Sequence, residues 1–365
     1  MGQKALTIVL LFSASFATTV AAKPGCSFEK SGTVNSTSPK IDEGYVPTND
    51  GTRLFYQKVG NGKQTVIIPG GLFLFEDFKQ FAKGRTLIFY DMRGRGRSDA
   101  IPDDRKSSTV SIFDDVKDIE RIRQHFKVNR FSLIGYSYLG LMTVMYAMDH
   151  PERVERIVQM GPVPLKFDTK YPEQFTNNDK LTDIGANVDE VARLEKLRDE
   201  GYISTNPQDY CEKDWQVTRY RLVGNPANVE KLGKSRCEMP NEWPVNLRKH
   251  FQYSFVSVQK LDIPREKVAQ LKIPVLTIHG TKDRNAPYGS GREWVSMLSN
   301  ARLLTIPGAA HQSWVDAPEI IFPAIEIFLK GGWPGKAEKA SALPSYSNPY
   351  IVGRSPTGSN DEGWN

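Results

Sequence analysis

A serine between two glycines follows a short apolar run near the middle of the chain, in the order Gly135-Tyr-Ser137-Tyr-Leu-Gly140. The apolar residues 131–136 are typical of a buried strand, and residues 141–148 have the composition of a helix. A serine on a sharp turn between a strand and a helix has a strained backbone, and its hydroxyl is exposed above the edge of the sheet. The pattern predicts that Ser137 is a nucleophile. Because Gly-x-Ser also occurs by chance, the prediction depends on partners further along the chain.

A serine hydroxyl needs a base to take its proton. The chain has five histidines, and His311 lies in a loop of small residues just after the apolar run at residues 302–306. In open parallel sheets, ligands and catalytic groups lie in the loops at the carboxyl ends of strands. We therefore predict that His311 is the base. The others occur where surface, capping or loop roles are expected, and they are His125, His150, His250 and His279.

The base needs an acid that orients it, and Asp283 lies in the loop that follows the predicted strand at residues 273–278. Aspartate is also common in turns, so Asp283 taken alone is either the catalytic acid or a turn residue. The chain order Ser137, Asp283, His311 is, however, the order of the triad in the α/β-hydrolase fold. All three residues follow predicted strands, which favours a catalytic triad over coincidence.

Such a triad needs two N–H groups that stabilise the oxyanion of the tetrahedral intermediate. One donor is expected to be the backbone N–H of Tyr138, directly after the serine. The other is expected in the loop Pro69-Gly-Gly-Leu72, where glycines let the main chain approach the substrate. We predict Gly71 as this second donor.

Predicted strands and helices alternate along most of the chain, which indicates a mostly parallel central sheet with helices on both faces. The alternation stops at residues 163–264, where charged helical segments predict an inserted helical lid, or cap. The core is thus predicted in two parts, residues 23–162 and 265–330. Residues 331–365 are rich in Gly, Pro, Ser and Asn without periodicity, which predicts a mostly disordered tail.

Residues 1–22 have the pattern of a secretory signal peptide: a lysine, an apolar stretch and small residues before Lys23. The chain is therefore expected to be exported, to the periplasm or outside the cell, with no membrane span after cleavage. Positive and negative side chains are mixed and the net charge is only +6, so no nucleic-acid partner is expected.

Three cysteines remain after the predicted cleavage. In an oxidising compartment Cys211 and Cys237 could pair, and a bridge across their 26-residue separation would contribute about 3 kcal/mol. Cys26 would then be unpaired. Free buried thiols are the alternative for all three.

Over residues 48–330 the chain resembles the prolyl-iminopeptidase-like serine aminopeptidases of the α/β-hydrolase fold. The motifs that carry the resemblance are Pro69-Gly-Gly-Leu72, Asp91-x-Arg-Gly-x-Gly-x-Ser-Asp99, Gly135-x-Ser-x-x-Gly140, Gly280-x-x-Asp283 and His311. Four positions differ from the family pattern: Pro69 replaces a histidine and Leu72-Phe73 replace Pro-Gly in the first motif, and Leu139 replaces a glycine in the elbow. The resemblance implies a lid that shapes the pocket, and neither a metal nor an organic cofactor.

Members of this family bind the free amino terminus of a peptide through acidic lid residues. The resemblance implies acidic candidates in Glu212, Glu238 and Glu242, and a solvated helix face is the alternative for each. Trp215 and Trp243 are expected either to wall the pocket or to fill the small core of the lid. The expected function is that of a serine hydrolase that releases an N-terminal residue from short peptides through an acyl-enzyme. A carboxylesterase with the same triad, or a non-catalytic binding protein on this scaffold, are the alternatives.

Overall fold

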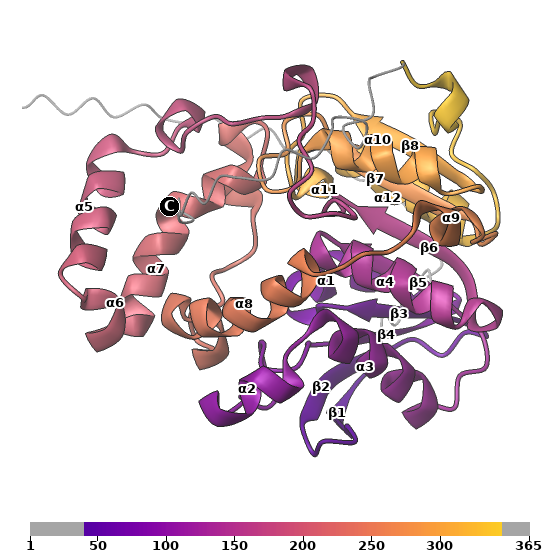
Figure 1. Cartoon of the computed structure of the whole chain (residues 1–365), viewed down its shortest axis with the longest axis horizontal. Coiled ribbons are helices and arrows are strands. Elements are labelled where there is room, and N and C mark those ends of the chain that lie inside the picture. Colours follow the sequence, from indigo (N-terminus) through magenta and orange to yellow (C-terminus); the bar gives the residue numbers. More distant parts are fainter. Residues whose placement is uncertain (1–39, 345–365) are drawn as a thin grey trace, which may run out of the picture. The chain divides into compact units, whose positions relative to one another are not determined.

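The computed structural model describes residues 40–344 of the 365-residue chain, so the predicted signal peptide and Cys26 lie outside the described residues. An eight-stranded sheet in the order β1-β2-β4-β3-β5-β6-β7-β8 forms the centre (Figure 1). The strands are β1 Ile41–Pro47, β2 Arg53–Val59, β3 Gln64–Pro69, β4 Arg85–Tyr90, β5 Phe131–Tyr136, β6 Val154–Met160, β7 Val275–Gly280 and β8 Ala301–Ile306.

The sheet is mostly parallel. Strand β2 pairs antiparallel with β1 and β4, and all other neighbouring strands pair in parallel. After β3 the chain turns back to one side to form β4, whereas β5 lies on the other side of β3. The loops after β3 and β5 therefore diverge, which opens a crevice at the carboxyl ends of these strands.

Helices cover both faces of the sheet, as the sequence predicts (Figure 1). They are α1 Gly71–Phe78, α2 Asp103–Thr109, α3 Ile112–His125, α4 Tyr138–Asp149, α10 Tyr288–Met297, α11 Ser313–Asp316 and α12 Pro318–Leu329. Short 3-10 helices are η1 Lys79–Ala82, η2 Pro151–Arg153, η3 Glu173–Phe175, η4 Thr182–Ile184, η5 Arg219–Leu222, η6 Pro226–Lys231, η7 Pro240–Glu242 and η8 Ala340–Ala342.

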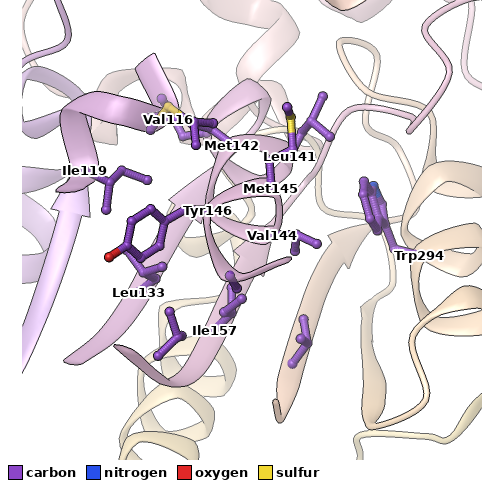
Figure 2. Packing of buried hydrophobic residues seen from close by; sticks show 14 of the residues in the cluster. Val116, Ile119, Leu133, Leu141, Met142, Val144, Met145, Tyr146, Ile157 and Trp294 are labelled. Carbon is purple, nitrogen blue, oxygen red and sulfur yellow. The ribbon is translucent and has the colours of Figure 1, made fainter. Parts of the chain in front are cut away.

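The apolar core has two layers because neighbouring residues of a strand point to opposite faces of the sheet. Leu133 of β5 belongs to the layer under α3, α4 and α10, whereas Ile134 belongs to the layer under α1 and α12. Figure 2 shows part of the first layer, where Leu133 and Ile157 of the sheet lie beneath side chains of α4 such as Tyr146. The strand that carries Ser137 is thus fixed from both faces.

The segment between β6 and β7 contains the predicted lid, residues 163–264. Its helices α5, α6 and α7 lie together at the left of Figure 1, and α8 contacts α2 and α3 of the core. The helices of this segment are α5 Val188–Asp199, α6 Tyr202–Thr205, α7 Pro207–Thr218, α8 Pro244–Gln259 and α9 Arg265–Ala269. We refer to residues 163–264 as the lid.

The lid is cross-linked internally and is also tied to the core. A disulfide joins Cys211 of α7 to Cys237, with the two Cα atoms 5.6 Å apart. In addition, Arg95 of the core forms a buried ion pair with Glu242 of the lid, and both nitrogen–oxygen distances are 2.9 Å.

The predicted disordered tail is wrong for its first part. Residues 331–344 pack on the core: Glu338 forms a β-bridge with Leu303 of β8, and the ring of Trp333 lies 5.0 Å from that of Phe328. These contacts satisfy backbone groups without any periodic pattern that the sequence could reveal. Residues 345–365 lie outside the described range. No helix among residues 40–344 is long and apolar enough to cross a membrane.

Candidate active site

Ser137 lies on a strained turn between β5 and α4. Its backbone angles are φ 57° and ψ −126°, which non-glycine residues rarely adopt. The Ser137 N–H donates to the carbonyl oxygen of Met160 at 2.8 Å, which ties the turn to β6. A Cβ atom on Gly135 would lie 2.4 Å from the carbonyl oxygen of Leu139, so only glycine allows this close approach of strand and helix. The local geometry is that of a nucleophile elbow.

His311 and Asp283 form a buried pair. Nδ1 of His311 lies 2.7 Å from Oδ2 of Asp283, and the side chains are only 4% and 1% exposed. Oδ1 of Asp283 accepts the backbone N–H groups of Asn285 and Ala286, each at 2.9 Å. Because Nδ1 faces a carboxylate, it carries the proton, which leaves Nε2 free to accept another. The pair thus has the tautomer that a general base needs.

A second imidazole supports the same carboxylate. Nε2 of His279 lies 2.9 Å from the carbonyl oxygen of Ala286 and 3.2 Å from Oδ2 of Asp283. Burial alone would raise the pKa of Asp283, but His311 and His279 outweigh it and hold this pKa well below its usual range. Asp283 is therefore a carboxylate at neutral pH. The sequence indicated only a loop position for His279.

The structure brings Ser137 and His311 to one cavity of about 470 Å³ that lies between core and lid. The ring of His311 lies 4.6 Å from that of Tyr136, the residue directly before the serine. Asp283 lies behind the imidazole, in contact with its Nδ1. Ser137, Asp283 and His311 thus lie at the carboxyl ends of β5, β7 and β8, although the first and last are 174 positions apart in the sequence.

Gly161, which follows β6, lies against this pair and was not identified from the sequence. Its φ is +49°, and a Cβ atom there would lie 2.9 Å from Oδ2 of Asp283 and 3.2 Å from Nδ1 of His311. A larger residue would displace one of the two side chains. The signal in the sequence is weak, because a glycine after a strand has many structural explanations.

The two predicted oxyanion donors lie on neighbouring helix N-termini. Tyr138 is the first residue of α4 and lines the cavity, and Gly71 is the first residue of α1. Since the first N–H groups of a helix have no acceptor inside it, both groups can bind an anion. Gly71 itself is buried and does not line the cavity, whereas Phe73 of the same helix does. The loop is nevertheless adjacent to the elbow, because Gly70 packs against the side chain of Leu139.

Of the predicted substrate-binding residues, Trp215 and Glu242 line the cavity, whereas Glu212, Glu238 and Trp243 do not. Glu212 and Trp243 line a separate depression, and the indole of Trp243 donates to the carbonyl oxygen of Cys237. The reason is helical register. The residues of α7 that line the cavity recur at helical spacing, and they are Cys211, Asp214, Trp215 and Thr218. Glu212 is one residue out of this register, about 100° around the helix.

Glu242 does line the cavity, but Arg95 and the backbone N–H of Gly96 bind its carboxylate. Burial would raise the pKa of Glu242, and the Arg95 charge more than offsets this, so its pKa is below the usual value. Asp214 is the other acid on the wall, and burial raises its pKa to about 6. Within residues 40–344 it forms no ion pair, and Thr218 donates to it weakly at 3.3 Å. Sequence reasoning did not identify Asp214.

A buried acid beside the elbow gives a testable pH dependence. Asp115 of α3 accepts a hydrogen bond from the hydroxyl of Tyr138 at 2.7 Å, and burial raises its pKa to about 7. The folded protein therefore binds more protons than the unfolded chain between about pH 4 and 7, so stability falls as the pH rises through this window. Asp115→Asn mimics the neutral form. In urea unfolding the variant is expected to lose less stability than the wild type between pH 5 and pH 8.

The exposed Asp104 provides the control, since Asp104→Asn should leave the wild-type pH profile unchanged. Equal slopes for Asp115→Asn and wild type would contradict the raised pKa of Asp115.

Residues 66–318 match the family model described as alpha/beta hydrolase fold. Among curated relatives, a proline iminopeptidase of Lactobacillus helveticus is 24% identical over 315 residues, which are 80% of this chain and 98% of the relative. Two solved structures are similar in fold. One is the 2-hydroxy-6-oxo-6-phenylhexa-2,4-dienoate hydrolase of Rhodococcus sp. strain RHA1, with a TM-score of 0.57 and 18% identity over 80% of this chain and 99% of that one. The other is an esterase from Exiguobacterium antarcticum, with a TM-score of 0.58 and 15% identity over 79% and 99%.

Proposed function

The chain belongs to the α/β hydrolase fold family, and we propose that it is an exported serine hydrolase that releases the N-terminal residue of short peptides. The observation that carries the proposal is the buried His311–Asp283 pair at the same cavity as the strained Ser137. The resemblance to proline iminopeptidases supports the peptide substrate. Asp214, a partly buried acid without an ion-pair partner among the described residues, is the group on the wall that suits an α-ammonium.

The reaction follows from the three side chains. Nε2 of His311 takes the proton of the Ser137 hydroxyl while Oγ attacks the carbonyl carbon of the first residue. The N–H groups of Tyr138 and Gly71 stabilise the oxyanion. The intermediate collapses with protonation of the leaving amine by His311, which leaves an acyl-enzyme. Water then attacks the ester with His311 as base, and the free residue and the serine hydroxyl are regenerated.

Export is supported by the disulfide between Cys211 and Cys237, because such bonds persist in oxidising compartments and are rare in the cytosol. The expected destination is the periplasm or the outside of the cell, reached through the signal-peptide pattern of residues 1–22.

A carboxylesterase is the second candidate, and one observation favours it. The acidic lid residue Glu242, which the family resemblance implied as an amine ligand, is already bound by Arg95 and Gly96. An ester substrate would need no amine ligand, and the triad would act in the same way.

Labelling with a fluorophosphonate probe tests the nucleophile. The wild-type protein is expected to react once, at Ser137, and Ser137→Ala should not react at all. Ser254→Ala is the matched control and should react like the wild type. Ser254 lines the same cavity, but the proposed base His311 acts on Ser137. Absence of labelling in folded wild-type protein would favour a non-catalytic binding protein.

A substrate panel separates the two enzymatic candidates. Prolyl and alanyl arylamides are compared with short acyl nitrophenyl esters, with Ser137→Ala as the blank. The peptidase predicts release of arylamine, preferentially from the prolyl compound. Turnover of the esters without any arylamine release would replace the peptidase by the esterase.

A further inference from the structure

One guanidinium on the cavity wall has aromatic neighbours but no carboxylate. Arg236 of the lid lines the cavity, and its guanidinium carbon lies 4.2 Å from the ring centre of Phe73 and 5.5 Å from that of Trp215. Among residues 40–344, no acidic side chain forms an ion pair with it. Aromatic faces attract a guanidinium but leave its N–H groups in the ring plane free to donate. Arg236 therefore presents unused donors to whatever fills the cavity.

The nearest acid does not neutralise Arg236, because that acid is already engaged. Both carboxylate oxygens of Glu242 accept hydrogen bonds from Arg95 at 2.9 Å, and one of them also accepts from the Gly96 N–H. Burial lowers the pKa of Arg236, and the charge of Glu242 only partly compensates. Among residues 40–344, Arg236 thus has no carboxylate of its own to neutralise it.

A disulfide next to Arg236 fixes its position relative to α7. The next residue, Cys237, is bonded to Cys211 of α7, and Trp215 lies one helical turn further along that helix. The disulfide therefore holds the guanidinium against the ring of Trp215. A donor that is already ordered loses little entropy when it binds a ligand.

The contact with Phe73 relates Arg236 to the reacting bond. Phe73 lies two residues after Gly71, the predicted oxyanion donor, on the first turn of α1. The guanidinium thus contacts the ring of Phe73, which follows the loop that is expected to hold the substrate carbonyl. In a dipeptide, the C-terminal carboxylate follows the scissile bond by one residue, about 3.5 Å of extended chain.

We propose that Arg236 is a carboxylate-binding subsite, and that the preferred substrates are dipeptides whose C-terminal carboxylate it binds. The proposal rests on the proposed function for the position of the scissile bond. A dipeptide is a zwitterion, and the cavity wall has one group for each end: Asp214 for the ammonium and Arg236 for the carboxylate. A longer peptide carries its carboxylate beyond this position and loses the interaction.

Prolylglycine and prolylglycinamide provide the test, because they share the scissile bond and differ only in the terminal carboxylate. The wild-type enzyme is expected to have a kcat/KM at least about tenfold higher for prolylglycine, the size of one charge-assisted hydrogen-bonded contact. Arg236→Gln should remove this preference, so that kcat/KM for prolylglycine falls to about that for prolylglycinamide. Arg236→Lys should restore part of it, since the charge is kept and the paired donors are lost.

Arg219→Gln is the matched control. Arg219 also belongs to the lid, but it pairs with Glu230 and does not line the cavity, so this variant should keep the wild-type preference. Equal kcat/KM for the two substrates in the wild type overturns the subsite, and so does an unchanged preference in folded Arg236→Gln. If Arg236→Gln does not fold, the proposal is tested by the kcat/KM values of the wild type for the two substrates and by the same comparison in Arg236→Lys.

Calorimetric titration of Ser137→Ala with the same two compounds separates this proposal from the proposed function. Tighter binding of prolylglycine supports the subsite even if the wild type hydrolyses neither peptide, in which case the peptidase fails alone. Hydrolysis of prolyl arylamides without tighter binding of prolylglycine leaves the peptidase and overturns the subsite.

Discussion

Asp283→Asn is expected to lower kcat/KM about 10⁴-fold, because the variant would hold the catalytic histidine in the wrong tautomer. An asparagine has one oxygen, and the N–H groups of Asn285 and Ala286 both need it at the Oδ1 position. The amide nitrogen then faces His311 in place of Oδ2. Because that nitrogen is a donor, His311 must place its own proton on Nε2, where it can no longer accept the proton of Ser137.

Steady-state kinetics on the best substrate of the panel measures this loss, and labelling of Ser137 should slow with it. The variant also changes how the free energy of unfolding depends on pH in acid. The pKa of Asp283 is depressed in the folded state, so its contribution to stability is present above the unfolded value of about 4 and is lost as the pH falls further. Asp283→Asn lacks this loss. A variant with near-normal kcat/KM would remove Asp283 from the triad.

Gly161→Ala is expected to lower kcat/KM about 10²-fold, because displacements of about 1 Å in a catalytic pair have effects of this size. The added Cβ atom would lie 2.9 Å from Oδ2 of Asp283, which is closer than van der Waals contact allows, so the Asp283–His311 pair must shift. The backbone adds a cost of about 1–2 kcal/mol, since φ at this position is +49°. Chemical unfolding measures this second effect independently of activity.

Gly233→Ala is the control for this substitution. A Cβ atom on Gly233 would meet no other atom within 4 Å, and φ at this position is not positive, so alanine there should change neither kinetics nor stability appreciably. If Gly161→Ala retains full activity, the loop after β6 does not fix the pair.

The fold and the grouping of the three candidate triad residues could be predicted from the sequence for one physical reason. In a parallel sheet, polar residues directly after buried strands all reach the same edge, so Ser137, Asp283 and His311 could be grouped without coordinates. Gly71 and Tyr138 follow from the same rule, and the structure places both at helix N-termini. Their roles in catalysis remain predictions.

The lid was less accessible to sequence reasoning. Its helices have short apolar stripes and many charges, so the face of α7 that points into the cavity could not be read from periodicity. Glu212 was therefore predicted, and Asp214, two positions away, was not identified. Similarly, Arg95 and Glu242 are 147 residues apart, and no local pattern links them. The packing of residues 331–344 on the core depends on isolated contacts, such as the bridge from Leu303 to Glu338 and the ring contact of Trp333 with Phe328, which composition does not reveal.

The ion pair between Arg95 and Glu242 has a consequence for the other proteins that share a compartment with this enzyme. Opening the lid would break this buried pair together with the hydrogen bonds that Asn241 donates to the carbonyl oxygens of Gly96 and Ser98, so several contacts hold the lid on the core. Substrates must then enter through whatever opening the closed form has. Under the proposed peptidase function, folded proteins are therefore too large to be substrates, and short peptides are the polypeptides that can reach Ser137.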